Sequence, residues 1–329
     1  MDGLPQTFRL ETAAFGAAPR LAGLGFGMQR TLRNAISCVG VGLHSGRKVS
    51  LSLRPAPADT GIVVRRTDLG IDIPARWDNV VDTRLCTVLG LPGQPAHRVG
   101  TVEHVLAALA GCGVHNAVLE VDAPEMPILD GSAAAFVFLI DCAGIVEQDQ
   151  PLRAIEVLRP VRVSQGDAYA ELRPGVHGFD IAGSIAFEAE AIGRQALTLR
   201  LSETSFRTDL ARARTFALAA EIDSLRAAGL ARGGSLDNAV VVDGAQVLNP
   251  AGLRMQDEFV RHKLLDVVGD LSLAGAPLRA RLLAHRPGHA LNNRLLHALF
   301  ADAANWRFAP QPEPLASWHA GLPAAAAPV

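Results

Sequence analysis

The sequence has little of several features that would assign it to a specialised class of protein. Aromatic residues make up 5% of the 329 residues and the formal net charge is −2, whereas nucleic-acid-binding proteins are usually basic and rich in exposed aromatics. No apolar run approaches the ~20 residues that a membrane-spanning helix needs, and the longest candidate is interrupted by Asp141. We therefore expect neither a nucleic-acid partner nor a transmembrane segment.

Cysteine is also sparse, and the four cysteines are scattered with no close pair. This spacing predicts neither a zinc knuckle nor a disulfide framework, and it fits a reducing cytoplasm best. Residues 1–27 are rich in Ala, Gly and Arg but lack the apolar core of a secretory signal, so we predict a flexible tail there. Residues 306–329 are rich in Pro and Ala, and we predict that they are disordered.

Residues 28–150 show the pattern of one α+β unit. Alternating apolar and polar residues predict a hairpin between about 30 and 54, and a second extended pair follows it. A helix is expected from Thr101, which is a good N-cap residue, followed by the strand NAVLEVDA and a helix capped by Ser132. The polar residues around 148–151 are interpreted as a linker between two domains.

Residues 151–305 begin again with strands. Helical material is predicted over 206–229, and the hairpin NAVVVDGAQVLN turns at Asp243-Gly244, the strongest hairpin signal in the chain. A helix over 257–275, a strand and a helix from His289 complete the unit. Both halves end in the same order of elements, which predicts an α+β fold of two similar layered domains packed face to face.

The helix predicted over 257–275 carries His262, Asp266 and Asp270 at intervals of four residues, on one stripe opposite an apolar arc. A His and an Asp one turn apart can direct a nitrogen and an oxygen at one point, as a divalent metal requires. Charged stripes on helices are usually solvated faces, so this helix alone does not establish a metal site. Face-to-face packing of the halves would bring His104 toward His262 and Asp266, giving a ligand set of two His and one Asp.

Neighbouring polar residues are candidates for acid–base chemistry. Glu103 precedes His104, and a carboxylate beside a metal can take a proton from an attacking water, although a lone His in a helix more often packs or caps. His289 is either a turn residue or, if protonated, a group that stabilises an oxyanion and protonates a leaving amine, with Asp270 keeping it charged. Two further residues, ordinary on a surface or in a loop, could stabilise developing negative charge: Lys263 and Thr215.

Several segments between Met28 and Leu299 together form a specific pattern: GVGLHSG, DTRLCT, TVEHVLAALAG, NAVLEVDAPEMPILDGSAAAFV, ARTF, GLARGGSLDNAVVVD, DEFVRHKLLDVVGDL and GHALNNRLL. In these segments the chain resembles the UDP-3-O-acyl-N-acetylglucosamine deacetylases, the zinc amidases of lipid A biosynthesis. The resemblance implies two similar α+β domains, each a sheet layered on helices, with the active site at their interface and a small insert in each domain. It also implies a cytoplasmic enzyme, expected to be a monomer, that releases acetate from a UDP-linked acylated glucosamine.

The resemblance also implies roles for individual residues. His104, His262 and Asp266 would bind one Zn²⁺ per chain, and Glu103 would be the general base. His289 would be the cationic acid. The supporting residues would be Thr215, Lys263 and Asp270.

In that family the second insert, a β-α-β unit, forms an apolar passage for the acyl chain. Here it would cover about 216–249. Its candidate contacts, which a local satellite core would also explain, are Phe216, Ile222, Leu236 and Val241. The basic residue before the Gly-His pair, commonly Lys in relatives, is Arg286 here, and Arg can also bind the diphosphate.

Two other classes of function are alternatives to a deacetylase. A catalytically inactive sugar-nucleotide-binding regulator of the same fold would be expected to lose at least one residue of the polar set, which is complete here. An RNA-binding module is conceivable because two-layer α+β units also bind nucleic acid, but the slightly acidic charge argues against it. Metal analysis paired with an acetate-release assay distinguishes these alternatives.

Overall fold

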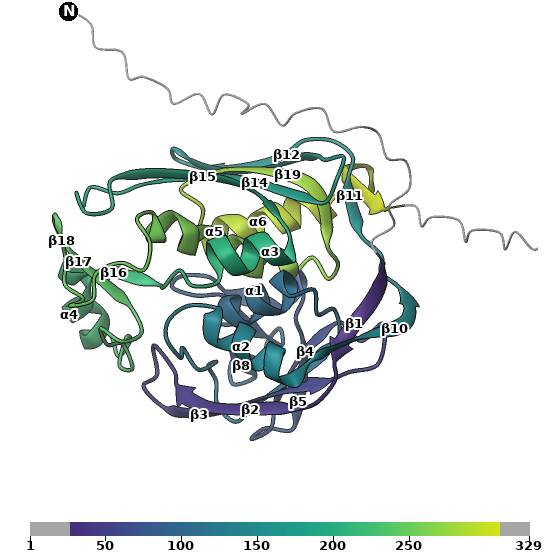
Figure 1. Cartoon of the computed structure of the whole chain (residues 1–329), viewed down its shortest axis with the longest axis horizontal. Coiled ribbons are helices and arrows are strands. Elements are labelled where there is room, and N and C mark those ends of the chain that lie inside the picture. The colour runs from purple at the N-terminus through teal and green to yellow at the C-terminus, as the bar shows by residue number, and fades with distance from the viewer. Residues whose placement is uncertain (1–26, 310–329) are drawn as a thin grey trace, which may run out of the picture.

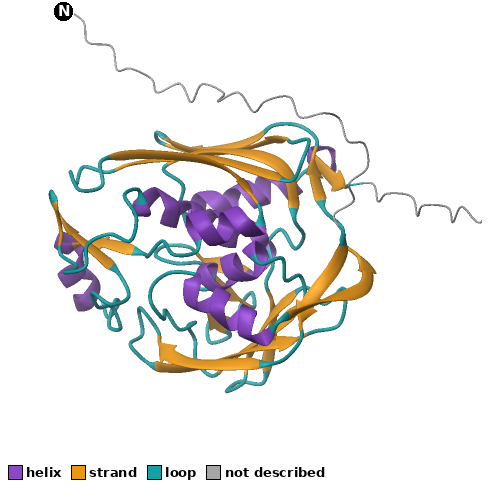
Figure 2. Ribbon diagram, in the orientation of Figure 1, coloured by secondary structure: helices purple, strands orange, loops and turns teal. Residues whose placement is uncertain are grey.

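The computed structural model describes residues 27–309 (Figure 1). Two sheets form the outer layers and helices lie between them (Figure 2), which confirms the predicted α+β class. The first sheet has the strand order β2-β3-β9-β4-β5. The elements of this half are β2 (Ile36–Val41), β3 (Lys48–Pro55), β4 (Ile62–Arg66), β5 (Ile71–Pro74), α1 (Glu103–Gly111), β9 (Ala117–Val121) and α2 (Ala134–Ala143).

The second half repeats this topology. Its elements are β12 (Val161–Gln165), β13 (Ala168–Pro174), β14 (Phe179–Ala186), β15 (Arg194–Leu201), α5 (Glu258–Ser272), β19 (Leu278–His285) and α6 (His289–Phe300). Strand β19 pairs antiparallel with β13 and parallel with β14, just as β9 pairs antiparallel with β3 and parallel with β4. The topological repeat predicted from the sequence is therefore confirmed.

Each half carries an extra small sheet between its fourth strand and its first long helix. Insert I contains η1 (Trp77–Asn79), β6 (Val80–Asp82), β7 (Val88–Gly90) and β8 (Arg98–Val99). Two short helices, α3 (Glu203–Ser205) and η2 (Phe206–Leu210), lead to the second extra sheet. Insert II contains β16 (Phe216–Leu218), α4 (Ala219–Ala227), β17 (Val240–Asp243) and β18 (Gln246–Val247). In Figure 1 it projects at the left, beyond the central helices.

The remaining strands correct two predictions. The residues interpreted as a linker lie in β10 (Ile145–Pro151), which pairs with β1 (Met28–Leu32), and the polar side chain of Gln148 hydrogen-bonds Asn116 and the Ala56 carbonyl. The predicted disorder from 306 is wrong for β20 (Trp306–Phe308), which follows η3 (Ala303–Asn305) and pairs with β11 (Ile155–Val157). The tail predictions for 1–26 and 310–329 lie outside the described residues.

Two local predictions also differ from the structure. Thr101 does not cap a helix, because its backbone is left-handed (φ 55°) and its hydroxyl donates to Glu125 Oε1 at 3.1 Å. Residues 206–229 are not one helix, because β16 interrupts them; Glu258 binds Arg214 in the segment just before that strand. Within 27–309, every helix is too short or too polar to cross a lipid bilayer.

Helices α1 and α5 pack directly against each other at the centre of the molecule. The apolar arc predicted for α5 is buried, as Val260 and Leu264 illustrate. The polar stripe is buried as well, with His262, Asp266 and Asp270 only 1%, 3% and 2% exposed. The interpretation of this stripe as a solvated face is therefore wrong.

Gly269 makes the close approach of these two helices possible. A Cβ at this position would lie 2.1 Å from the backbone oxygen of Glu103. Helix propensity alone favours Ala over Gly, but this clash is with backbone and cannot be relieved by a side-chain rotation.

We expect Gly269→Ala to lower the free energy of unfolding by about 2 kcal/mol or more, measured by thermal and urea unfolding. Unchanged or increased stability would contradict this account of the helix contact.

Candidate metal centre and active site

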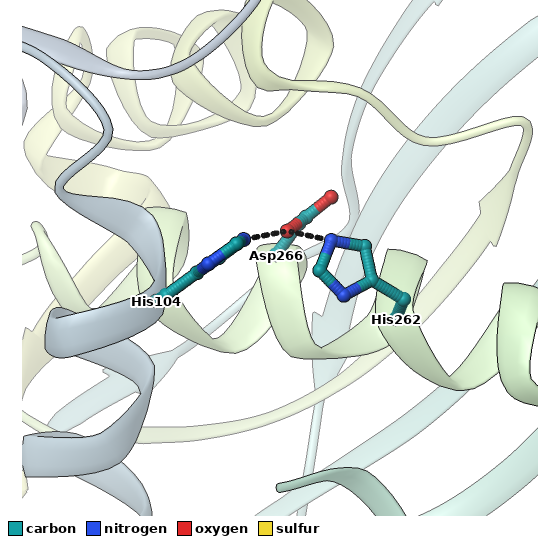
Figure 3. A group of neighbouring side chains, drawn as sticks. All are labelled: His104, His262 and Asp266. Carbon is teal, nitrogen blue, oxygen red and sulfur yellow. Dashed lines mark ion pairs between the residues drawn. The ribbon is translucent and has the colours of Figure 1, made fainter. Parts of the chain in front are cut away.

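Three candidate metal ligands meet where α1 packs on α5 (Figure 3). Their ligand atoms all lie within 4.8 Å of one another, and all three side chains are buried. Asp266 Oδ1 lies 3.6 Å from Nε2 of His104 and 3.3 Å from Nε2 of His262. His262 and Asp266 are one turn apart on α5, whereas His104 reaches the same point from α1 of the other half.

The hydrogen bonds around these residues leave the facing atoms free for a metal. His262 Nδ1 lies 3.0 Å from the Ala213 carbonyl, so it donates there and the lone pair of Nε2 faces Asp266. Asp266 Oδ2 accepts from Lys263 at 3.0 Å, whereas Oδ1 is buried and has no hydrogen-bond partner among residues 27–309. Buried carboxylate oxygens are normally paired, so this oxygen between two imidazole nitrogens fits a divalent cation, and the donor set suits zinc.

The charges of these groups also suit metal binding. Burial lowers the pKa of His262 to about 4, which keeps the imidazole neutral. Burial opposes the charge of Asp266, but the ammonium group of Lys263, which donates to Oδ2, helps to hold the pKa of this carboxyl well below its usual range. A neutral imidazole and an ionised carboxylate are the forms that bind metals.

Glu103 and His289 lie next to this centre. Glu103 Oε1 is 3.8 Å from His289 Nε2, and the other ring nitrogen, Nδ1, lies 2.9 Å from Asp270 Oδ2. Burial opposes the charged form of His289, but Asp270 and Glu103 raise its pKa to about 9. Burial raises the pKa of Glu103, and the positive charge of His289 acts against this shift. At neutral pH the site therefore holds a cationic imidazole between two carboxyl groups.

A cavity of about 100 Å³ lies in front of these groups. Among the predicted site residues, its walls include Glu103, His104, Thr215, Phe216, His262, Lys263, Asp266 and His289. A second cavity of about 480 Å³ shares Lys263 and His289 with the first and is also lined by Arg286. The Arg286 guanidinium contacts the Asp167 carboxylate and donates to the Ala186 carbonyl.

Three of the predicted acyl-chain contacts lie in insert II, outside both cavities. Ile222 is half-buried on α4, Leu236 is 42% exposed and Val241 is buried in β17. A satellite core does form here, and it contains the neighbours of Val241 in the strand, Val240 and Val242. Because successive side chains of a strand point to opposite faces, this core does not account for Val241. Phe216 packs against the core and also faces the first cavity.

Sequence reasoning missed two uncharged residues beside the site. The Thr87 backbone N–H donates to Glu103 Oε2 at 3.1 Å, and Asn292 Nδ2 donates to Asp270 Oδ2 at 2.8 Å. Both residues lie in segments that carried the family resemblance, DTRLCT and GHALNNRLL, and this was the one signal available. Nothing in the type or spacing of Thr87 and Asn292 indicates their partners.

Comparison with known proteins identifies the family of this chain. The family model of LpxC, UDP-3-O-acyl N-acetylglycosamine deacetylase, matches residues 29–301. The chain belongs to this family. Its relatives named UDP-3-O-acyl-N-acetylglucosamine deacetylase include a protein of Idiomarina loihiensis, 50% identical over 299 residues that cover 88% of this chain and 97% of the relative.

Two further relatives carry the same name. A protein of Acidithiobacillus ferrooxidans is 50% identical over 285 residues, covering 85% of this chain and 92% of the relative. One of Shewanella oneidensis is 49% identical over 282 residues, covering 84% and 91%. The LpxC-family chain is accordingly an enzyme of the amidohydrolase class.

The ligand set predicts how metal content responds to substitution. His104→Ala or His262→Ala removes one of three donors, so we expect each variant to lose most of its bound metal while keeping its fold. Elemental analysis of the purified protein and circular dichroism measure the two quantities. His285→Ala is the matched control, because this half-buried imidazole bonds Ser184 outside the site. Full metal occupancy in both ligand variants would show that the set is not a metal centre.

Proposed function

We propose that this LpxC-family enzyme hydrolyses the N-acetyl group of UDP-3-O-acyl-N-acetylglucosamine in a zinc-dependent step of lipid A biosynthesis. The names of the relatives supply the substrate. The observation that carries the chemistry is the unpaired buried Oδ1 of Asp266, which faces two imidazole nitrogens beside Glu103 and His289. The enzyme would act in the cytoplasm as a monomer on a small molecule, with residues 28–150 and 151–305 as its two domains.

His104, His262 and Asp266 would hold the zinc ion. When bound there, zinc supplies Lewis-acid polarisation of the amide carbonyl and activation of water. Glu103 takes a proton from the attacking water as general base. The Thr87 N–H fixes Oε2 of this carboxylate, which leaves Oε1 on the side of His289.

His289 carries out the complementary proton transfer. As a cation it stabilises the developing oxyanion and then protonates the leaving amine. Asp270 orients the ring through Nδ1, which leaves Nε2 directed toward Glu103 and the reacting atoms. Thr215 and Lys263, both on the cavity wall, are proposed to support the oxyanion.

The substrate would extend from the metal centre in two directions. We propose that its diphosphate lies in the second cavity near Arg286 and that its acyl chain passes Phe216 into insert II. The apolar side chains of insert II outside the satellite core support this path: Ile222, Leu236 and Val241. An inactive regulator would have no use for a His289 whose pKa is raised to about 9 beside Glu103, so this pair favours the enzyme.

The direct test is acetate release from the acylated substrate by the purified protein. Activity should disappear when a chelator removes the metal and return when zinc is added. Substrate binding without acetate release by the zinc-loaded protein would indicate the inactive regulator instead.

The pH profile tests the role of His289. Its pKa is raised to about 9, so the acid is present below that pH, and kcat/KM should fall as pH rises through about 9. Ionisation of Glu103 gives the acidic limb, so the profile is a bell. We expect His289→Ala to keep its metal, to lose on the order of 10²-fold or more in rate, and to lose the basic limb. A near-normal rate with both limbs unchanged would show that His289 only begins α6.

The acyl path is tested by a charge on insert II. Ile222→Lys should raise KM for the acylated substrate far more than for a substrate without the acyl chain. A charged group in the passage opposes binding of the apolar acyl chain and does not affect the rest of the substrate. Val176→Lys is the matched control, since Val176 is apolar, 71% exposed and far in sequence from insert II. Equal effects of Ile222→Lys on both substrates would indicate general damage to insert II.

A further inference from the structure

Thr87 lies in insert I, immediately before β7, yet it contacts both halves of the molecule. Its side chain is buried, with 2% exposure. The preceding residues Leu85 and Cys86 line the first cavity, so the segment runs along the site before Thr87 turns into the interior. In the proposed chemical steps only the backbone N–H of Thr87 has a role, through Glu103, and its side chain has none.

Three polar atoms of Thr87 are engaged. The backbone N–H donates to Glu103 Oε2 at 3.1 Å, and the carbonyl accepts from the backbone N–H of Val102, the residue before α1, at 3.4 Å. The hydroxyl donates to Asp270 Oδ1 on α5 at 2.6 Å, across 183 positions of sequence. One uncharged residue thus bonds both carboxylates that flank His289.

Both oxygens of the Asp270 carboxylate accept hydrogen bonds. Oδ2 of Asp270 accepts from His289 Nδ1 and from Asn292 Nδ2. Among the described residues, the hydrogen bonds of Oδ1 come from the Thr87 hydroxyl alone. Asp270 is 2% exposed, so loss of this donor would leave a charged oxygen buried without a partner. A carboxylate that rotates to relieve this would no longer hold the His289 ring.

We propose that Thr87 is a positioning residue of the active site, whose hydroxyl fixes Asp270 and thereby holds the His289 ring against Glu103. The effect on rate rests on the proposed deacetylase function. The positioning itself can be observed without substrate.

Thr87→Val isolates the hydroxyl, because Val keeps the branched shape of the side chain but has no donor. Thr87→Ser is the matched variant that keeps the donor. We expect kcat to fall about 10- to 100-fold in Thr87→Val, because this is the rate equivalent of the free energy of one hydrogen bond to a buried charged group. KM and metal content should stay unchanged, because Thr87 lies behind the residues that face the cavity. Thr87→Ser should restore most of kcat. Equal kcat values for wild type and Thr87→Val would overturn the proposal.

A double-mutant cycle with His289→Ala tests the route of the effect. If Thr87 acts through Asp270 on His289, Thr87→Val should have almost no further effect on kcat once His289 is absent. If the two losses multiply, Thr87 acts elsewhere and the proposal is wrong.

A matched control separates positioning from stability. Thr31, in β1 and away from the site, is also buried, at 6% exposure. Its hydroxyl donates to the Asn116 carbonyl at 2.7 Å. Thr31→Val should lower Tm and leave kcat unchanged. If Thr87→Val does not fold, Thr87→Ala is measured by the same readouts and the same outcomes apply.

The readout without substrate is the proton on His289 Nδ1, followed by NMR of histidine-labelled protein and assigned by its absence in His289→Ala. Held against Asp270, this proton should give a downfield signal in wild type and Thr87→Ser. We expect the signal to shift or exchange away in Thr87→Val. An identical signal in all three proteins would overturn the proposal. If wild type released no acetate, the proposed function would fail, but this measurement would still decide the role of Thr87.

Discussion

The burial of charged side chains where α1, α5 and α6 meet is the constraint on which the rest of the structure depends. Ionised carboxylates are costly to remove from water unless they are paired, and here the partners come from different parts of the chain. Glu103 on α1 faces His289 on α6, and Asp270 on α5 is bonded by Thr87 of insert I. The two halves therefore satisfy each other's buried charges, so the active site exists only when both halves have folded and docked.

Local sequence patterns correctly predicted the structural features that depend on interactions between residues close in the chain. The period of α5, the hairpin at Asp243-Gly244 and the repeated order of elements were all correct, because side-chain periodicity and turn chemistry act over a few residues. The cap at Thr101 was not, because a distant hydrogen-bond partner, Glu125, overrides a local preference. The linker at 148–151 was misassigned because the polar side chain of Gln148 serves hydrogen bonds within the fold.

The candidate site, like the fold, could be predicted in part from the sequence. His262 and Asp266 could be paired from their spacing on one helix, and the topological repeat was enough to bring His104 to them. The sequence of α5 alone could not show whether its polar stripe is solvent-exposed or buried. Its burial depends on the backbone of α1, which packs closely against Gly269. The bond between Thr87 and Asp270 could not be predicted from residue type or spacing, because a hydrogen bond across 183 positions leaves no local pattern.

The place of the inserts has a consequence for how such an enzyme can diversify. Both extra sheets occur at the same point of the repeated topology, between the fourth strand and the first long helix. The helices that hold the reacting groups are anchored by the two main sheets. The proposed role of insert II as the acyl passage implies that changes in its length or sequence alter which molecules are admitted, while the proposed metal ligands stay fixed. Evolution can then act on the entrance without changing the helices that carry those ligands.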